Sequence, residues 1–447
     1  MKQLYSFRIF ILTLMLFLLN LCIHSYVSAQ SGIGVPAMQA CDSLVQSFLT
    51  KWLIPGATVA LAKDGKLIYM RGFGTADRFG AEVTQPYHMF RIMSVSKPVT
   101  AIAIMKLRES DMLSLDDHIF GPGGILASDP YIAGATISDS RIYDITVRNC
   151  LEHTTGWNRD IPITPSPLPP YPFGFPISDP KEFPLHVTSV LGEPNPITGR
   201  GMVKFILQRG LDYAPGTEFH YGNMEYTILA LVIEQLTGMS YEEYVSSAIL
   251  EPLGIYDMHL GKSLAANKME REGEYTAIGT ILSSFGTGQY VPYQYGGLNW
   301  ESFGGFGGWI SSARDLVRLI LAVDGFSTKP DILTAASIDT MITPSSVGAG
   351  VAKGWFVDGS GNWNHNGDMS GTQCLVERLA NGYTWVMIVN RREYNTWSQQ
   401  LGDLYSLASN CIASISSTPA FDLLEVPTHN DTNMTFSNIT THNIKTN

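Results

Sequence analysis

The sequence predicts an α/β protein of the α+β type, in which an antiparallel sheet from both termini is flanked by helices and accompanied by a mostly helical lobe. Two strand-like runs in residues 56–74 meet at Asp64-Gly65, a dipeptide typical of tight hairpins. Residues 372–392 repeat this pattern. Between the two hairpins, apolar residues recur at helical spacing in five segments, 98–110, 147–156, 224–238, 240–254 and 312–325. The helical lobe is therefore expected between the two halves of the sheet.

One globular domain is expected over residues 36–415, with the helical lobe inserted at roughly 98–312. Inside the lobe, residues 157–199 are too rich in proline for a helix or a central strand. We expect this stretch to form an ordered surface excursion or a flexible lid.

The C-terminal stretch, residues 417–447, is polar and rich in Ser, Thr and Asn. Such a composition is typical of a disordered tail. Three sequons, at Asn430, Asn433 and Asn438, make this tail a candidate for glycosylation.

The N-terminus has the pattern of a secretory signal peptide over residues 1–29. Lys2 and Arg8 precede an apolar run at residues 9–23, and small residues lead up to Ala29. We expect a secreted protein without a stable membrane span after cleavage. The alternative is a membrane anchor formed by residues 9–23, a run that is short for a bilayer.

Removal of the leader leaves four cysteines, Cys41, Cys150, Cys374 and Cys411. An even number suits an oxidising compartment, and three pairings are possible. Cys41 and Cys411 lie on amphipathic segments near the two ends of the domain, so we hypothesise a bridge that clamps the termini. Four buried free thiols remain the alternative.

The formal net charge of −11 disfavours a nucleic-acid partner. With 45% hydrophobic and 15% charged residues, the composition is that of a globular protein. The expected partner is a small-molecule or peptide substrate, and the sequence leaves the oligomeric state open.

Ser94 and Lys97 begin an otherwise apolar helical segment. Residues three apart share a helix face, so the hydroxyl and the amine would meet. Pro98 is tolerated only in a first turn, which places Ser94 at a helix N-terminus. This is a nucleophile beside a possible base, provided that burial or a neighbouring cation lowers the pKa of the lysine. The alternative is a serine N-cap followed by a snorkelling lysine.

Two further motifs carry polar side chains. Tyr221 and Asn223 stand two apart in an extended approach to the helix at 224–238, so both can face one cleft. The alternative is a core tyrosine and an Asn N-cap. His365 and Gly367 stand just before the strand that begins near residue 372, where glycine permits close approach and imidazole can donate to a developing charge. The alternative is a histidine in a surface loop.

Ser-x-x-Lys, Tyr-x-Asn and a basic residue-x-Gly, in this order, resemble the serine β-lactamase and penicillin-binding-protein superfamily, specifically its class C-like branch. The stretches "LEHTTGW", "PGTEFHYGNMEYTILALVIEQLTG" and "GGFGGWISSARDLVRLI" also resemble that branch, and the likeness runs from about residue 40 to 410. The resemblance implies a β-lactamase/transpeptidase-like fold, with a cleft between the sheet and the helical lobe.

The resemblance also implies roles for these residues. Ser94 would be the acylated nucleophile, while Lys97 and Tyr221 would share its deprotonation and the delivery of a proton to the leaving group. Asn223, His365 and Gly367 would bind substrate, and the backbone amides of Ser94 and Asp368 would form the oxyanion hole. His153 is expected to be structural.

Departures from the family pattern leave the substrate open. His365 stands in place of lysine and Asn366 in place of threonine, and neutral imidazole dominates above about pH 7. Asp368 follows the glycine, where a small residue is usual. A motif with histidine at this position resembles that of esterases, D-aminopeptidases and other lactamase-like hydrolases.

The leading interpretation is a secreted serine hydrolase that cleaves an ester or amide through an acyl-enzyme. One alternative is a true β-lactamase or a D,D-peptidase or D-aminopeptidase, and another is a non-catalytic secreted binding protein on the same fold. The sequence lacks Gly-x-Ser-x-Gly, His-Glu-x-x-His and nucleotide-binding motifs. No cofactor and no metal are expected.

Overall fold

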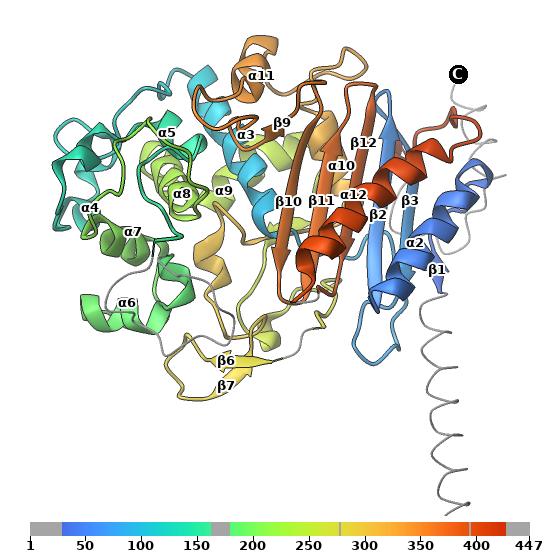
Figure 1. The fold of residues 1–447 in the computed structure, drawn as a ribbon, viewed down its shortest axis with the longest axis horizontal. Helices are drawn as coiled ribbons and strands as arrows, with labels where there is room; N and C mark the ends of the chain where they lie inside the picture. Colours follow the sequence, from blue (N-terminus) through green and yellow to red (C-terminus); the bar gives the residue numbers. More distant parts are fainter. Residues whose placement is uncertain (1–28, 162–178, 277–278, 393–394, 426–447) are drawn as a thin grey trace, which may run out of the picture.

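The computed structural model describes residues 29–161, 179–276, 279–392 and 395–425. Its central feature is a seven-stranded antiparallel sheet in the order β1-β3-β2-β12-β11-β10-β9 (Figure 1). The strands are β1 Gln30–Ser31, β2 Gly56–Lys63, β3 Lys66–Gly74, β9 Phe356–Val357, β10 Trp363–Met369, β11 Thr372–Arg378 and β12 Tyr383–Val389. The prediction of an antiparallel sheet drawn from both chain ends is confirmed.

The β2–β3 hairpin forms where the Asp64-Gly65 dipeptide predicts it. Both residues have positive φ, 49° and 77°, which suits a two-residue hairpin turn of the kind that matches the twist of the strands. On the other side of β2, Ala60 pairs with Val386 of β12, so the first and last thirds of the chain are joined in the middle of the sheet.

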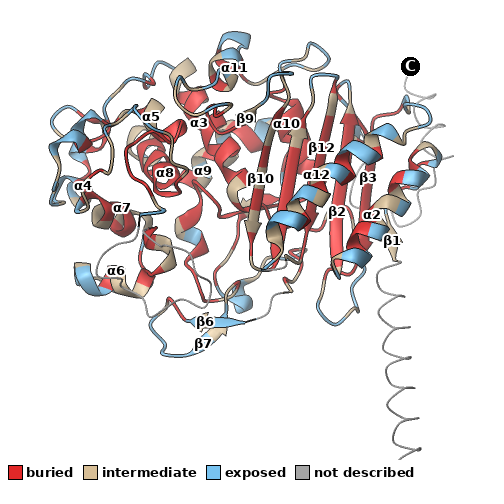
Figure 2. Cartoon of the chain, viewed as in Figure 1, coloured by how far each residue is buried: buried red, intermediate tan, exposed pale blue. Residues whose placement is uncertain are grey.

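Helices cover both faces of the sheet. Helix α2 Gln39–Lys51 and helix α12 Trp397–Ala413 lie side by side on the face nearest the viewer, and α10 Ala313–Leu321 packs on the opposite face (Figure 1). The inner strands β2, β3, β11 and β12 are mostly buried between these layers, whereas α2 and α12 expose their outer sides (Figure 2).

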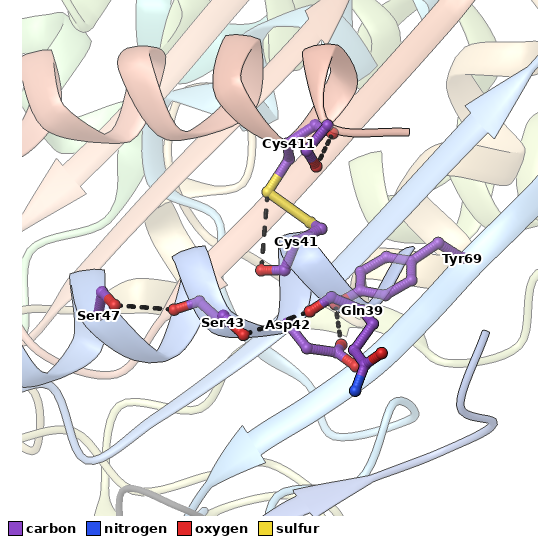
Figure 3. The surroundings of a disulfide bond; sticks show 8 residues. Gln39, Cys41, Asp42, Ser43, Ser47, Tyr69 and Cys411 are labelled. Atoms are coloured by element: carbon purple, nitrogen blue, oxygen red, sulfur yellow. Dashed lines mark hydrogen bonds between the residues drawn. A yellow bond between two sulfur atoms is a disulfide. The ribbon is translucent and has the colours of Figure 1, made fainter. Parts of the chain in front are cut away.

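A disulfide between Cys41 and Cys411 ties α2 to α12, with the Cα atoms 4.6 Å apart (Figure 3). Beside it, the Tyr69 hydroxyl of β3 donates to Asp42 over 2.7 Å. The predicted bridge between the terminal helices is confirmed. Cys150 and Cys374 are buried free thiols.

The helical lobe is organised around α8 Met224–Thr237, whose first ten residues are all buried. A helix that is apolar on every side belongs inside a protein, and α8 is packed against α3, α5 and α7. The other helices are α3 Ser96–Glu109, α4 Pro130–Ala133, α5 Val147–Leu151, α6 Pro184–Leu191, α7 Gly199–Leu207, α9 Tyr241–Val245 and α11 Ala335–Ile342.

Two small sheets complete the described structure. The first has the order β4-β8-β5, with β4 Phe90–Arg91, β8 Trp309–Ser311 and β5 Met258–Leu260, and it leads directly into the segment that carries Ser94. The second pairs β6 Thr280–Leu282 with β7 Tyr290–Pro292.

Two expectations about irregular segments are wrong in part. Within the proline-rich stretch 157–199, residues 184–191 form helix α6, because its proline occupies the first turn, where a missing N–H costs nothing. Within the expected tail 417–447, residues 423–425 form a 3₁₀ helix against β3, and Asp422 accepts a hydrogen bond from the amide of Leu67.

Several predictions concern the chain outside the described residues. The signal peptide, the alternative anchor at 9–23 and the sequons at Asn430, Asn433 and Asn438 all lie there. In the described part of the chain, no helix combines the length and apolar character needed to cross a bilayer.

Removal of the Cys41–Cys411 disulfide is expected to destabilise the fold without rearranging it. A bridge that closes so long a loop restricts the unfolded chain, so Cys41→Ser with Cys411→Ser should lower the free energy of unfolding by about 2–4 kcal/mol in urea titrations. Reductant should lower the stability of the wild type and leave the double variant unchanged. Equal stability of the two oxidised proteins would contradict the clamp.

Candidate active site

Ser94 lies in a short 3₁₀ turn, Met93–Val95, that runs directly into α3. The turn is held from both sides, because the amide of Ile92 donates to the Trp309 carbonyl over 3.1 Å and the Trp309 amide donates to Ser96 Oγ over 3.3 Å. Ser94 remains partly exposed. The predicted position at a helix N-terminus is confirmed, with Pro98 in the first turn of α3.

The Lys97 amine lies beneath Ser94 and is completely buried. Its Nζ is 3.2 Å from Ser94 Oγ, 2.9 Å from Asn223 Oδ1 and 3.3 Å from the carbonyl oxygen of Phe306. The face of the Tyr221 ring lies 4.7 Å from Nζ. The structure thus brings together the first two motifs, which are far apart in the sequence.

Burial lowers the pKa of Lys97 well below its ordinary value, and the positive charge of Arg159 lowers it further. The carboxylates of Glu225 and Asp179 act in the opposite direction. A neutral amine has two N–H donors and one lone pair. Asn223 and Phe306 supply two acceptors for the donors, so the lone pair is left to accept the Ser94 proton.

Asn223 is buried at the start of α8, where it occupies the N-cap position without a side-chain capping bond. Its Nδ2 donates to Asp179 over 2.7 Å, and this bond fixes Oδ1 toward Lys97. The interpretation of Asn223 as a simple helix cap is therefore wrong.

Tyr221 is half-buried, and its ring lies 4.7 Å from Lys97 Nζ, the nitrogen that contacts Ser94. Desolvation raises the pKa of Tyr221, so the phenol keeps its proton at neutral pH. Behind it, the His153 ring lies 4.6 Å from the Tyr221 ring, and His153 Nδ1 accepts from the amide of Gly222 over 3.3 Å. His153 supports the Tyr-x-Asn turn from behind, as expected of a structural residue.

His365 and Gly367 differ from the prediction in one respect. They do not precede a strand in a loop but lie inside strand β10, where Gly367 pairs with Cys374 of β11. Glycine is required at 367 because a Cβ there would lie 2.0 Å from the Ile92 carbonyl oxygen, just before Ser94. The close approach of Gly367 to Ile92 brings β10 against the segment that carries Ser94.

The His365 ring is buried, and its centroid lies 6.5 Å from that of Tyr221. Burial lowers the pKa of His365 to about 3, with a further contribution from Lys97. Its Nδ1 lies 2.7 Å from the Asn366 carbonyl oxygen, which places a proton on that nitrogen. The interpretation as a surface-loop histidine is wrong, and the imidazole is neutral across the physiological range.

The Asp368 side chain is bound by an arginine. Arg392 Nη2 donates to its carboxylate over 2.8 Å and Nε over 3.1 Å. Asp368 directly follows Gly367 on β10, so its backbone belongs to the strand that lies against the Ser94 segment.

Sequence reasoning missed three charged residues beside the motifs, namely Arg159, Asp179 and Glu225. Arg159 follows the "HTTGW" stretch and lies over the Tyr221 ring at 4.9 Å. Asp179 belongs to the proline-rich stretch, and Glu225 follows Asn223 on α8. The position of Glu225 inside the predicted buried helix was a signal, because an acidic residue is rarely buried without a role or a partner.

Glu225 is buried, and one of its carboxylate oxygens accepts from Thr155 Oγ1 over 3.0 Å. The other oxygen is 4.0 Å from His153 Nδ1. Burial raises the pKa of Glu225 to about 7. In the described part of the chain, no cluster of three His, Cys, Asp or Glu side chains is arranged to hold a metal ion.

Comparisons with known proteins place most of the chain in one family. A family model described as Beta-lactamase matches residues 41–407. Protein flp of Staphylococcus aureus (strain COL) is 27% identical over 218 residues, which are 48% of this chain and 37% of that protein. The chain therefore matches well under half the length of this relative.

Solved structures show the same fold. The octameric penicillin-binding protein homologue from Pyrococcus abyssi has a TM-score of 0.60 at 22% identity, covering 83% of this chain and 77% of that chain. The D-amino acid amidase from Ochrobactrum anthropi SV3 has a TM-score of 0.59 at 19% identity, covering 84% of this chain and 99% of that chain.

Replacement of Glu225 by glutamine should change how stability depends on pH. The folded-state pKa of about 7 lies above the ordinary 4.5, so the native protein binds the extra proton between these values and the wild type loses stability as pH rises through that window. Glu225→Gln lacks this loss. Its free energy of unfolding, relative to that of the wild type, should therefore rise by on the order of 3 kcal/mol between pH 5 and pH 8.

Urea titrations of both proteins at the two pH values measure the change. Glu251→Gln, at an exposed position, serves as the control and should track the wild type. A difference between Glu225→Gln and the wild type that stays constant with pH would show that Glu225 is ionised throughout.

Proposed function

Because the chain belongs to the beta-lactamase family, we propose that it is a serine hydrolase of the class C-like branch, which cleaves an ester or amide through an acyl-enzyme on Ser94. The observation that carries this proposal is the buried Lys97 amine, 3.2 Å from Ser94 Oγ, in surroundings that disfavour its protonation. A hydroxyl is a weak nucleophile until such a base takes its proton.

In the proposed reaction, Ser94 Oγ attacks the substrate carbonyl as its proton moves to Lys97. The resulting ammonium has acceptors already in place at Asn223 and Phe306, and the negative charges of Glu225 and Asp179 favour it. Tyr221 lies over Lys97, and desolvation raises its pKa, so the phenol holds a proton at neutral pH. It is placed to deliver that proton to the leaving oxygen or nitrogen.

The backbone amides of Ser94 and Asp368 are proposed to hold the oxyanion. The support is the close passage of β10 beside Ile92, which sets the two chain segments next to each other. Donors fixed in advance on two such segments cost no reorganisation, and one donor contributes about 3 kcal/mol in comparable sites.

The neutral state of His365 favours esters over β-lactams in this proposal. A lysine at this motif position would attract the substrate carboxylate, whereas a buried imidazole with a pKa of about 3 carries no charge at pH 7. The alternatives remain a β-lactamase, a D,D-peptidase or D-aminopeptidase, and a non-catalytic binding protein. The proposal includes amide substrates because the chain shares its fold with a D-amino acid amidase.

Secretion is part of the same proposal. The Cys41–Cys411 disulfide favours an oxidising compartment, in agreement with the signal-peptide pattern of residues 1–29.

The test is turnover of p-nitrophenyl esters, D-amino-acid p-nitroanilides and nitrocefin by the wild type and by Ser94→Ala. We expect short-chain esters to be hydrolysed well above nitrocefin, and Ser94→Ala to lose at least about a thousandfold in kcat/KM because it lacks the attacking atom. Faster hydrolysis of nitrocefin than of esters would favour a β-lactamase.

Labelling with a fluorophosphonate separates an enzyme from a binding protein. The label should appear on the wild type and on Ser43→Ala, an exposed serine of α2, and should vanish in Ser94→Ala. Labelling that persists in Ser94→Ala would place the nucleophile elsewhere, and no labelling at all would favour the binding protein.

A further inference from the structure

Met93, the residue before Ser94, has a strained backbone. Its φ is 51°, in the left-handed region, where the Cβ of an L-residue crowds the following carbonyl oxygen. Glycine adopts this conformation freely, whereas a long side chain is rarely found there. Strain of this kind persists only where the surrounding structure imposes it, and it concentrates at functional sites. The Met93 side chain is therefore a candidate for a role that glycine could not fill.

The Met93 side chain runs between the two chain segments that flank the nucleophile. A Cβ at Gly367 on β10 would lie 3.0 Å from Met93 Cβ, and a Cβ at Gly307 would lie 3.7 Å from the terminal Cε. Gly307 follows Phe306, whose carbonyl oxygen accepts from Lys97. The thioether thus reaches from β10 to the segment beside Lys97, and 8% of the residue remains exposed.

This path crosses the space that an acyl group needs in the proposed reaction. The proposed oxyanion donors are the amides of Ser94 and Asp368, which directly follow Met93 and Gly367 in the chain. Because Met93 and Gly367 are in contact, a carbonyl carbon held between the two amides lies next to the Met93 side chain. An acyl chain that continues from this carbon therefore meets the thioether.

We infer that Met93 is a specificity-determining residue, whose side chain closes the acyl pocket and restricts the substrate to short acyl groups. This inference rests on the proposed function and names its substrate class, esters or amides of short acyl groups such as acetyl or butyryl. Methionine suits the position because its flexible, apolar thioether fills an irregular gap. Gly307 adds no side chain on the far side of this gap, so Met93 alone closes it there.

The chain-length profile of ester hydrolysis tests the inference. kcat/KM is measured for p-nitrophenyl acetate, butyrate and octanoate with the wild type and with Met93→Gly. The wild type should prefer acetate or butyrate to octanoate. Met93→Gly removes both the side chain and the backbone strain, so the ratio of octanoate to acetate hydrolysis should rise at least about tenfold.

Two further variants change the pocket in other ways. Met93→Leu keeps an apolar side chain of similar volume and should retain the preference for short chains. Gly307→Ala places a methyl group in ordinary van der Waals contact with Met93 Cε and displaces no neighbour. It should narrow the pocket and lower the ratio of octanoate to acetate hydrolysis several-fold.

Leu53→Gly is the matched control for the strain. Leu53 has the same φ of 51°, but it is 59% exposed and belongs to the turn between α2 and β2. Its replacement by glycine relieves a comparable strain far along the chain from Ser94. The chain-length profile should therefore stay that of the wild type.

Equilibrium binding separates this inference from the hydrolase itself. Acetanilide and hexananilide are titrated by calorimetry into the Ser94→Ala protein and into the same protein with Met93→Gly added. The added substitution should strengthen the binding of hexananilide, relative to acetanilide, at least about tenfold, because the longer chain gains apolar contact in the opened pocket.

An unchanged profile in Met93→Gly with turnover intact would reject this role of Met93 and keep the hydrolase. Absence of ester turnover together with a Met93-dependent preference between the anilides would reject the hydrolase and keep the pocket. Anilide binding that does not depend on Met93, or an equal shift in Leu53→Gly, would overturn the inference. Should Met93→Gly not fold, Gly307→Ala decides, and an unchanged or higher ratio of octanoate to acetate hydrolysis overturns it.

Discussion

Burial of the Lys97 side chain is the constraint on which the rest of the site depends. Enclosing an amine in the core is costly when the amine is charged, so its surroundings favour the neutral form and leave its lone pair for the Ser94 hydroxyl. The same pocket supplies two acceptors for the remaining N–H groups. Proton transfer from Ser94 then creates a buried ammonium on Lys97. Desolvation disfavours this charge, but Asn223 and Phe306 already supply acceptors for its N–H groups.

The architecture brings together the three parts that enclose this amine. The 3₁₀ turn before α3 carries Ser94 and the first turn of α3 carries Lys97, while Tyr221 and Asn223 lie just before α8. Strand β10 passes close to Ile92. Asp179 and His153 hold the Tyr-x-Asn turn from behind, one through the Asn223 amide and the other through the amide of Gly222. Residues that contact no reacting atom thus set the geometry of those that do.

The hairpins and the contact between Ser94 and Lys97 were predictable because each depends on a local pattern. The disulfide between Cys41 and Cys411 spans 370 residues and was a hypothesis from two amphipathic terminal segments, and the expectation that the motifs converge came from the family resemblance. Asp64-Gly65 specifies a hairpin through its backbone preferences alone, and Ser94 and Lys97 meet because helical spacing places them together. The high proline content predicted no helix over residues 184–191. This prediction failed because the first turn of a helix tolerates proline, and Pro184 lies in the first turn of α6.

Arg159 and Asp179 were beyond sequence reasoning for a physical reason, whereas Glu225 left a signal as an acidic residue within the predicted buried helix. Their importance comes from the charges that surround them after folding, and a single sequence does not show which charges will be neighbours. The neutral state of His365 was only partly foreseeable, because the residue type gives a pKa near 6.5 while enclosure in β10 lowers it to about 3.

The link between α2 and α12 makes the polypeptide from Cys41 to Cys411 a closed covalent ring. A protease that cuts one loop between these residues opens the ring without releasing a fragment. The nicked molecule gains only the water of hydrolysis in mass, and its two pieces separate on a denaturing gel only after reduction. Cleavage in a surface loop therefore need not dissociate the two halves of the sheet, which remain paired through β2 and β12.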